Sequence, residues 1–164
     1  MNTLTPAKTG LITGMIMIGF SIILFYLAHL PVNSKWIYAV YSIFCGGAIF
    51  TLIRCARSEK SPIIFKEYFS KGFQYFLVVA LLMVVYTFIF HKLNPQIMEA
   101  QVSLNNQLAQ QEKSHTPAEI EANSQQLRNI FMPMTLMITA IIYLFLGTLI
   151  TVVTTAFLQQ LKKF

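Results

Sequence analysis

Four long apolar runs, separated by polar segments, set the pattern of the chain. A helix that crosses the hydrocarbon core of a bilayer needs about 20 mostly apolar residues, and each run has a length of this order. The runs therefore predict membrane-spanning helices at about 9–30, 36–54, 72–91 and 130–158. We expect an all-α membrane protein in which residues 1–164 form a single four-span membrane domain.

The segment SPIIFKEYFSKGF, between the second and third runs, separates into an aromatic face and a charged face when it is read with helical spacing. Ser61 followed by Pro62 is typical of a helix start. We predict a short amphipathic helix at 61–71 that lies flat in the cytoplasmic membrane interface and turns at Gly72 into the third span. Such a helix either anchors and positions the third span or docks a lipid or a partner protein. The predicted interface residues are Phe65, Lys66, Tyr68, Phe69 and Lys71.

The polar segment 92–129 carries the signals of two helices, the first of which Pro95 can open. Thr116, Pro117 and Glu119 form a capping-box pattern at the start of the second. We predict an extracytoplasmic helical hairpin whose second helix continues into the fourth span. An apolar stripe on the first helix is either buried against a stripe on the second or offered to a partner. The first stripe contains Ile97, Ala100, Leu104 and Leu108, and the second contains Ile120, Leu127 and Ile130 or Phe131.

The composition also favours a membrane location. The chain is 55% hydrophobic and 11% charged, whereas a typical soluble domain is about 25% charged. The net charge of +6 does not indicate a nucleic-acid partner, because the basic residues cluster at the ends of the apolar runs, where lipid headgroups lie. Membrane lipids are the expected partners of these charges.

The basic residues set the expected orientation, because cytoplasmic loops of membrane proteins carry an excess of Lys and Arg. With four spans, the N-terminus, the loop after the second span and the C-terminus lie on one side. This side carries eight of the 12 basic residues, namely Lys8, Arg54, Arg57, Lys60, Lys66, Lys71, Lys162 and Lys163. The opposite side carries Lys35, Lys92, Lys113 and Arg128. We expect a multi-pass protein with both termini in the cytoplasm.

Residues that carry chemistry are sparse. The chain has no Asp, and no Asp, Glu, Lys or Arg lies in the middle of a span, so a proton relay or a carboxylate cation site in the bilayer is not expected. Ser21 and Ser42 have no His at their depth that could serve as a base. We therefore expect no enzymatic activity and no cofactor.

His29 and His91 lie at the extracytoplasmic ends of the first and third predicted spans. Two histidines are the beginning of a metal site, and a third ligand would have to be His115 or a glutamate of the following loop. The simpler interpretation, which we adopt, is two interface side chains without a metal.

Small residues at helical spacing predict close helix packing. Gly10 and Gly14 form a G-x-x-x-G pair, and Ser42 with Gly46 forms a looser one. Thr135, Thr139, Tyr143, Gly147, Thr151 and Thr155 recur every four residues in the fourth span. These lines serve either packing within the chain or contact with a second copy or another membrane protein. The predicted packing residues are Gly10, Gly14, Ser42, Gly46, Gly147 and Thr151.

Short motifs occur in a recognisable order: GLITG, IIFKEYFSKGF, KLNP just after the third run, and FMPM at the entry to the fourth. This arrangement resembles the domain of unknown function 4199 family, small bacterial inner-membrane proteins with four predicted helices. The family pattern has glycine or a small residue before the central aromatic segment, where this chain has KSPIIF. The resemblance implies the bacterial inner membrane and transfers no catalytic residue.

These features predict a non-enzymatic accessory or scaffolding subunit of a bacterial inner-membrane complex, bound to another membrane protein or to further copies of itself. One alternative is a small oligomeric carrier or channel, with a pathway lined by the threonines of the fourth span and Tyr143. A further alternative is a lipid-handling protein that uses the aromatic segment at 61–71.

Overall fold

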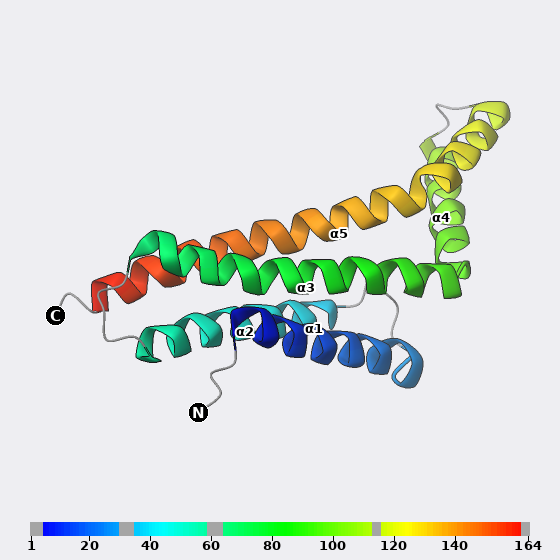
Figure 1. The fold of residues 1–164 in the computed structure, drawn as a ribbon. Helices are drawn as coiled ribbons and strands as arrows, with labels where there is room; N and C mark the ends of the chain where they lie inside the picture. Colours follow the sequence, from blue (N-terminus) through cyan, green and yellow to red (C-terminus); the bar gives the residue numbers. More distant parts are fainter. Residues whose placement is uncertain (1–4, 30–34, 59–63, 113–115, 162–164) are drawn as a thin grey trace. The chain divides into compact units, whose positions relative to one another are not determined.

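The computed structural model describes residues 5–29, 35–58, 64–112 and 116–161, and all regular structure in these residues is helical. The elements are α1 (Pro6–Ile22), the π-helix η1 (Ile23–Leu27), α2 (Ile37–Ser58), α3 (Phe65–Leu93), α4 (Gln96–Glu112) and α5 (Pro117–Leu161) (Figure 1). Within the described ranges, four helical stretches are long and apolar enough to cross a membrane: Pro6–Leu27, Ile37–Ser58, Phe65–Leu93 and Pro117–Leu161. The prediction of an all-α protein with four candidate spans is confirmed.

The backbone divides into two compact units. Unit 1 comprises Met1–Met83 and Ala140–Phe164, and unit 2 comprises Val84–Thr139. The helices α1 and α2, the N-terminal part of α3 and the C-terminal part of α5 belong to unit 1. The remainder of α3, all of α4 and the N-terminal part of α5 belong to unit 2. The two units are described separately below.

The first helix begins earlier than its apolar run, because Thr5 caps it. The Lys8 amide donates to the Thr5 hydroxyl at 3.4 Å, and Pro6 occupies the first turn, where its missing N–H costs nothing. At the other end α1 widens into η1, and the Ala28 amide donates to the carbonyl of Ile23. His29 then adopts a φ of 50°, in the left-handed region that ends helices.

The third helix differs from the prediction. We expected a separate in-plane helix at 61–71 with a turn at Gly72, but α3 runs without a break from Phe65 to Leu93. A glycine inside a helix costs only about 1 kcal/mol relative to alanine, which does not by itself end a helix. Ser61 and Pro62, the predicted helix start, lie outside the described residues. A separate amphipathic helix is therefore not confirmed.

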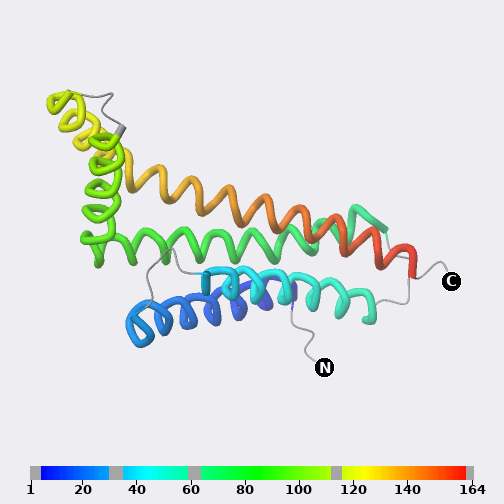
Figure 2. Tube along the Cα trace, turned by 180° about the vertical axis from the view of Figure 1, so that it is seen from behind, coloured from blue at the N-terminus to red at the C-terminus, as the bar shows by residue number. Residues whose placement is uncertain are grey.

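Glycines allow the helices of unit 1 to approach closely. A Cβ added to Gly10 would lie 2.6 Å from the backbone oxygen of Tyr75, and one added to Gly14 would lie 2.6 Å from the Leu82 side chain. Gly147 and Gly72 are just as tightly covered, the first by the Phe76 ring and the second by the Thr151 side chain. The predicted packing residues Gly10, Gly14, Gly147 and Thr151 thus all lie at contacts within unit 1. In Figure 2, α1 and α2 lie side by side.

The predicted pair of Ser42 and Gly46 does not pack in this way. Nothing lies within 4 Å of a Cβ added to Gly46, and the Ser42 hydroxyl is exposed and donates to the carbonyl of Tyr38 at 2.9 Å. The next residue, Gly47, is the packing glycine, because a Cβ there would meet the Tyr75 hydroxyl and the Thr13 side chain. Successive helical residues are rotated by about 100°, so only one of two adjacent glycines can face α1 and α3.

The two adjacent glycines provide a matched test. We expect Gly47→Ala to lower the unfolding temperature of the full chain in detergent, because the added methyl overlaps Tyr75 and Thr13. The expected cost is about 1–3 kcal/mol, the usual range for overpacking. Gly46→Ala is the control, and we expect it to be neutral or slightly stabilising, since alanine has the higher helix propensity. Equal unfolding temperatures for the two variants would contradict the packing described for α2.

Candidate functional site

Polar contacts pair α4 with the N-terminal part of α5 in unit 2. Arg128 donates from Nε to Oε1 of Glu99 at 3.1 Å and from its terminal nitrogen to Oε2 at 3.0 Å. The Ser124 hydroxyl donates to the side-chain oxygen of Asn106 at 2.7 Å. Later residues of α4 thus contact earlier residues of α5, so the two helical segments pair in antiparallel directions.

Local hydrogen bonds cap the start of α5 and the end of α3, which directly precedes α4. The Thr116 amide donates to the Glu119 carboxylate at 2.7 Å, and the Glu119 amide donates back to the Thr116 hydroxyl at 3.3 Å. These two bonds confirm the predicted capping box. Before α4, Asn94 is buried and donates from its side chain to the carbonyl of Phe90 at 2.8 Å, and Pro95 follows it directly.

The apolar stripe of α4 does not face α5. Leu104 is 48% exposed and Leu108 is 51% exposed, whereas Val102 is only 2% exposed. Of the two alternatives that the sequence left open for this stripe, the exposure of Leu104 and Leu108 does not support burial inside a hairpin. Glu99, Val102 and Asn106 share one helical face, and their contacts with α5 orient α4. Residue 104 is rotated about 200° from residue 102, so it points away from this face.

A shallow groove runs beside the ion pair. It has a volume of about 260 Å³ and is lined by Glu99, Val102, Ser103, Asn106, Gln107, Gln110 and Arg128. Amides, one hydroxyl and a charge pair give this groove hydrogen-bonding capacity, and the apolar contribution comes from Val102. Its lining includes no His, Cys or Lys, so the lining residues can bind polar groups but do not form a nucleophile and base pair.

The ion pair changes the acidity of Glu99. The hydrogen bonds from Arg128, followed by its positive charge, hold the pKa of the Glu99 carboxyl below its ordinary value of 4.5. Both side chains are substantially exposed, so solvent screens the pair and its contribution to stability is small. The pair therefore orients α4 on α5 more than it stabilises the protein.

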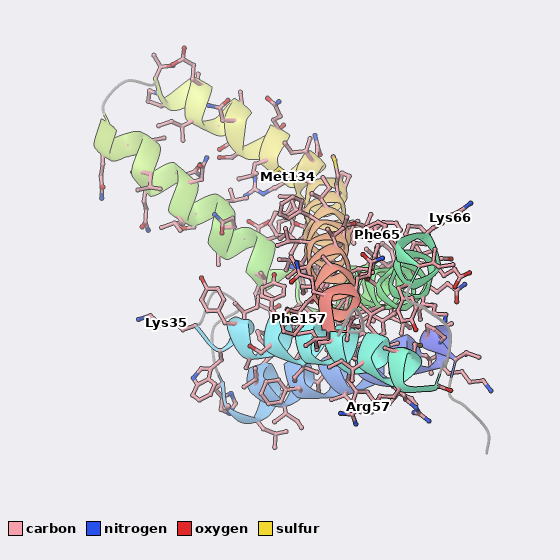
Figure 3. The ribbon with its side chains drawn as sticks, turned by 90° about the vertical axis from the view of Figure 1, so that its left-hand side faces the viewer. Lys35, Arg57, Phe65, Lys66, Met134 and Phe157 are labelled. Atoms are coloured by element: carbon pink, nitrogen blue, oxygen red, sulfur yellow. The ribbon has the colours of Figure 1, made fainter. Side chains whose placement is uncertain are left out.

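The structure separates the residues predicted to lie at the membrane interface. Phe65 is exposed and stacks on Phe69 with ring centroids 6.0 Å apart, and the Lys66 side chain extends away from the helices (Figure 3). The ammonium of Lys71 lies 4.7 Å from the centroid of the Tyr68 ring. These positions suit the predicted interface for Phe65 and Lys66.

Tyr68 departs from the predicted interface group. Its side chain is fully buried and packs in a cluster with Leu52, Ala56 and Leu158. The reason is its position on α3, because it lies on the same helical face as Gly72 and Tyr75, which also contact other helices of unit 1. Tyr68 therefore belongs to the core of unit 1.

The two candidate metal ligands have separate surroundings. His29 is exposed in unit 1. In unit 2, His91 Nδ1 lies 2.9 Å from the Thr87 carbonyl, and the His91 ring centroid lies 5.6 Å from that of Phe131. Among the described residues, no group of three or more His, Cys, Asp or Glu could hold a metal ion. His115, the proposed third ligand, lies outside the described residues.

Sequence reasoning missed a buried polar contact at the centre of unit 1. The Tyr75 hydroxyl donates to the backbone carbonyl of Phe44 at 3.0 Å, and the two rings stack with centroids 5.9 Å apart. The hydroxyls of Thr13 and Tyr75 both lie against Gly47. The sequence signal for this contact was a tyrosine inside an apolar run, because the hydroxyl of a buried tyrosine needs a hydrogen-bond partner.

The pH dependence of the ion pair can be tested. Because the pKa of Glu99 is lowered in the folded protein, its contribution is present above pH 4.5 and is lost as the pH falls through the folded pKa. We expect Glu99→Gln to lower the unfolding temperature slightly at pH 7 and to leave it unchanged at pH 2, relative to the parent chain. Glu67→Gln, at an exposed position of α3, is the control. A Glu99→Gln effect of the same size at both pH values would contradict the ion pair.

Comparison with known proteins identifies one related group. The family model described as "Protein of unknown function (DUF4199)" matches residues 8–160, which is nearly the whole chain. No curated protein and no solved structure matches the chain. The match confirms the resemblance that the order of short motifs indicated. The chain therefore belongs to the DUF4199 family.

Proposed function

We propose that this protein is a non-enzymatic accessory subunit of a bacterial inner-membrane complex and that α4 binds the partner protein. The observation that carries the proposal is the exposure of Leu104 and Leu108 on an otherwise polar helix. Leucines exposed to lipid need no explanation, but α4 is too polar to lie in a bilayer. Covering both side chains would contribute about 1–2 kcal/mol each.

Helix length supports an extramembrane position for this surface. α5 has 45 residues, which at 1.5 Å per residue gives about 67 Å, roughly twice the thickness of a bilayer core. Its N-terminal part is polar and pairs with α4, so we place these two segments together outside the membrane as a helical hairpin. The distribution of Lys and Arg supports an extracytoplasmic position for this hairpin and a cytoplasmic position for both termini.

The carrier or channel alternative receives less support from the threonines of α5. Thr135, Thr139 and Thr148 donate to the carbonyl four residues earlier, at 2.8, 2.9 and 2.8 Å. A hydroxyl that is bonded to its own helix contributes less to a polar pathway. The exposure of Phe65 and the outward direction of the Lys66 side chain support an anchoring role for this segment in addition to partner binding.

Native purification of the full chain in a mild detergent tests partner binding. We expect a foreign membrane protein to co-purify in stoichiometric amount and to be reduced at least ten-fold by the double variant Leu104→Gln, Leu108→Gln. The matched control is Gln101→Ala with Asn105→Ala, which changes two exposed residues of α4 at the same spacing. Quantitative mass spectrometry of the purified material gives the readout. A symmetric homo-oligomer without a foreign subunit, with ion flux in vesicles, would instead support the channel.

Reporter fusions test the proposed orientation. We expect a fluorescent protein that matures only in the cytoplasm to be active when it is fused after Phe164. An alkaline phosphatase that is active only outside the cytoplasm should be active when it is inserted after Glu112, and inactive when it is fused after Phe164. The opposite pattern, or activity of both reporters at one site, would contradict the orientation derived from the basic residues.

A further inference from the structure

The contact between the C-terminal part of α5 and the N-terminal part of α3, within unit 1, contains two unusual hydroxyl groups. We call this contact the α3–α5 seam and define it by Gly72, Phe76, Gly147 and Thr151, with Thr155 four residues after Thr151 on α5. Figure 2 shows the red end of α5 beside the beginning of α3. Thr151 and Thr155 are both 0% exposed.

Neither hydroxyl has a hydrogen-bond partner among the described protein groups. This is not a property of α5 as a whole, because Thr135, Thr139 and Thr148 on the same helix all donate to a carbonyl four residues earlier. A buried hydroxyl without a partner costs free energy, so most such groups in proteins are satisfied. The two groups therefore require a partner outside the described protein groups.

Packing of the seam limits what that partner can be. The Thr151 side chain covers Gly72, and the Phe76 ring covers Gly147, so a glycine of each helix is covered by a side chain of the other. The two helices are therefore closely packed here. A molecule that reaches the hydroxyls through such close packing must be very small and able to hydrogen-bond.

The polar residues near the seam indicate where such a molecule enters. Thr151, Thr155 and Gln159 recur every four residues and form a polar line that leads toward the end of α5 at Leu161. Thr155 is about 9 Å from that end, at 1.5 Å per residue. Lys71, which is half-buried, precedes Gly72 directly on α3. The line therefore leads from the two buried hydroxyls toward the end of α5.

We propose that the α3–α5 seam is a water-entry site, at which water passes from the end of α5 at Leu161 to the hydroxyls of Thr155 and then Thr151. Water fits because it is small, donates and accepts hydrogen bonds, and satisfies buried polar groups in proteins. This site is separate from the partner-binding surface on α4, so each proposal can fail without the other.

Cysteine accessibility in membrane vesicles tests the proposal. In a Cys45→Ala, Cys55→Ala background, the variants Thr155→Cys and Thr151→Cys are exposed to a small water-soluble methanethiosulfonate, which reacts with thiols that water reaches. The buried control is Leu52→Cys, and the lipid-facing control is Val153→Cys. We expect Thr155→Cys to react at least ten-fold faster than both controls, and Thr151→Cys to react more slowly than Thr155→Cys but faster than Leu52→Cys. Reaction of both at the Leu52→Cys rate would overturn the proposal.

Thermal unfolding of the full chain gives an independent readout. Valine has the shape of threonine without the hydroxyl, so Thr151→Val or Thr155→Val should raise the unfolding temperature if the hydroxyls are dry and unpaired. If water satisfies the hydroxyls, we expect no rise for either variant. Thr148→Val, at an exposed position, is the control. A rise with both Thr151→Val and Thr155→Val that Thr148→Val does not show would also overturn the proposal.

Discussion

The hydrogen bond from the Tyr75 hydroxyl to the Phe44 carbonyl is the contact on which unit 1 depends. A phenol in an apolar helix must find an acceptor, and here it reaches the backbone of α2. It can do so because Gly47 leaves room for the hydroxyl and because Gly10 lets α1 lie against the backbone of α3 at Tyr75. Three helices thus meet around one side chain, and the glycines face this meeting point.

Unit 2 is organised differently, since polar side chains orient its helices. The Glu99–Arg128 and Asn106–Ser124 pairs determine which face of α4 lies against α5. Charge-assisted, two-pronged bonds have a strict geometry, whereas leucines pack in many orientations. The consequence is that α4 turns Leu104 and Leu108 outward. A helix with its polar residues toward its neighbour and its leucines outside has an unfilled apolar face, which is the physical basis of the proposed partner binding.

Features that depend on neighbouring residues in the chain were predictable from the sequence. The four apolar stretches and the Thr116–Glu119 capping box are of this kind, because length, composition and short-range hydrogen bonds determine them. The rotation of each helix about its axis was not predictable. Gly46 and Gly47 are equivalent in the sequence, and only the position of Tyr75 selects the second. The burial of Tyr68 was not predictable for the same reason. Its aromatic neighbours Phe65 and Phe69 lie on a different face of the helix.

The threonines of α5 show how this limit affects functional interpretation. Their spacing of four residues predicted packing lines along the helix, but the threonines divide into two chemical groups. Thr135 and Thr139 are satisfied by their own helix and need nothing from their surroundings, whereas Thr151 and Thr155 are buried without such a bond. A threonine hydroxyl can bond to a carbonyl of its own helix. Where it does not, its hydrogen-bond partner is expected outside the helix. The chemistry of this protein is therefore expected where hydrogen-bonding groups lack a local partner, and not where polar residues are most numerous.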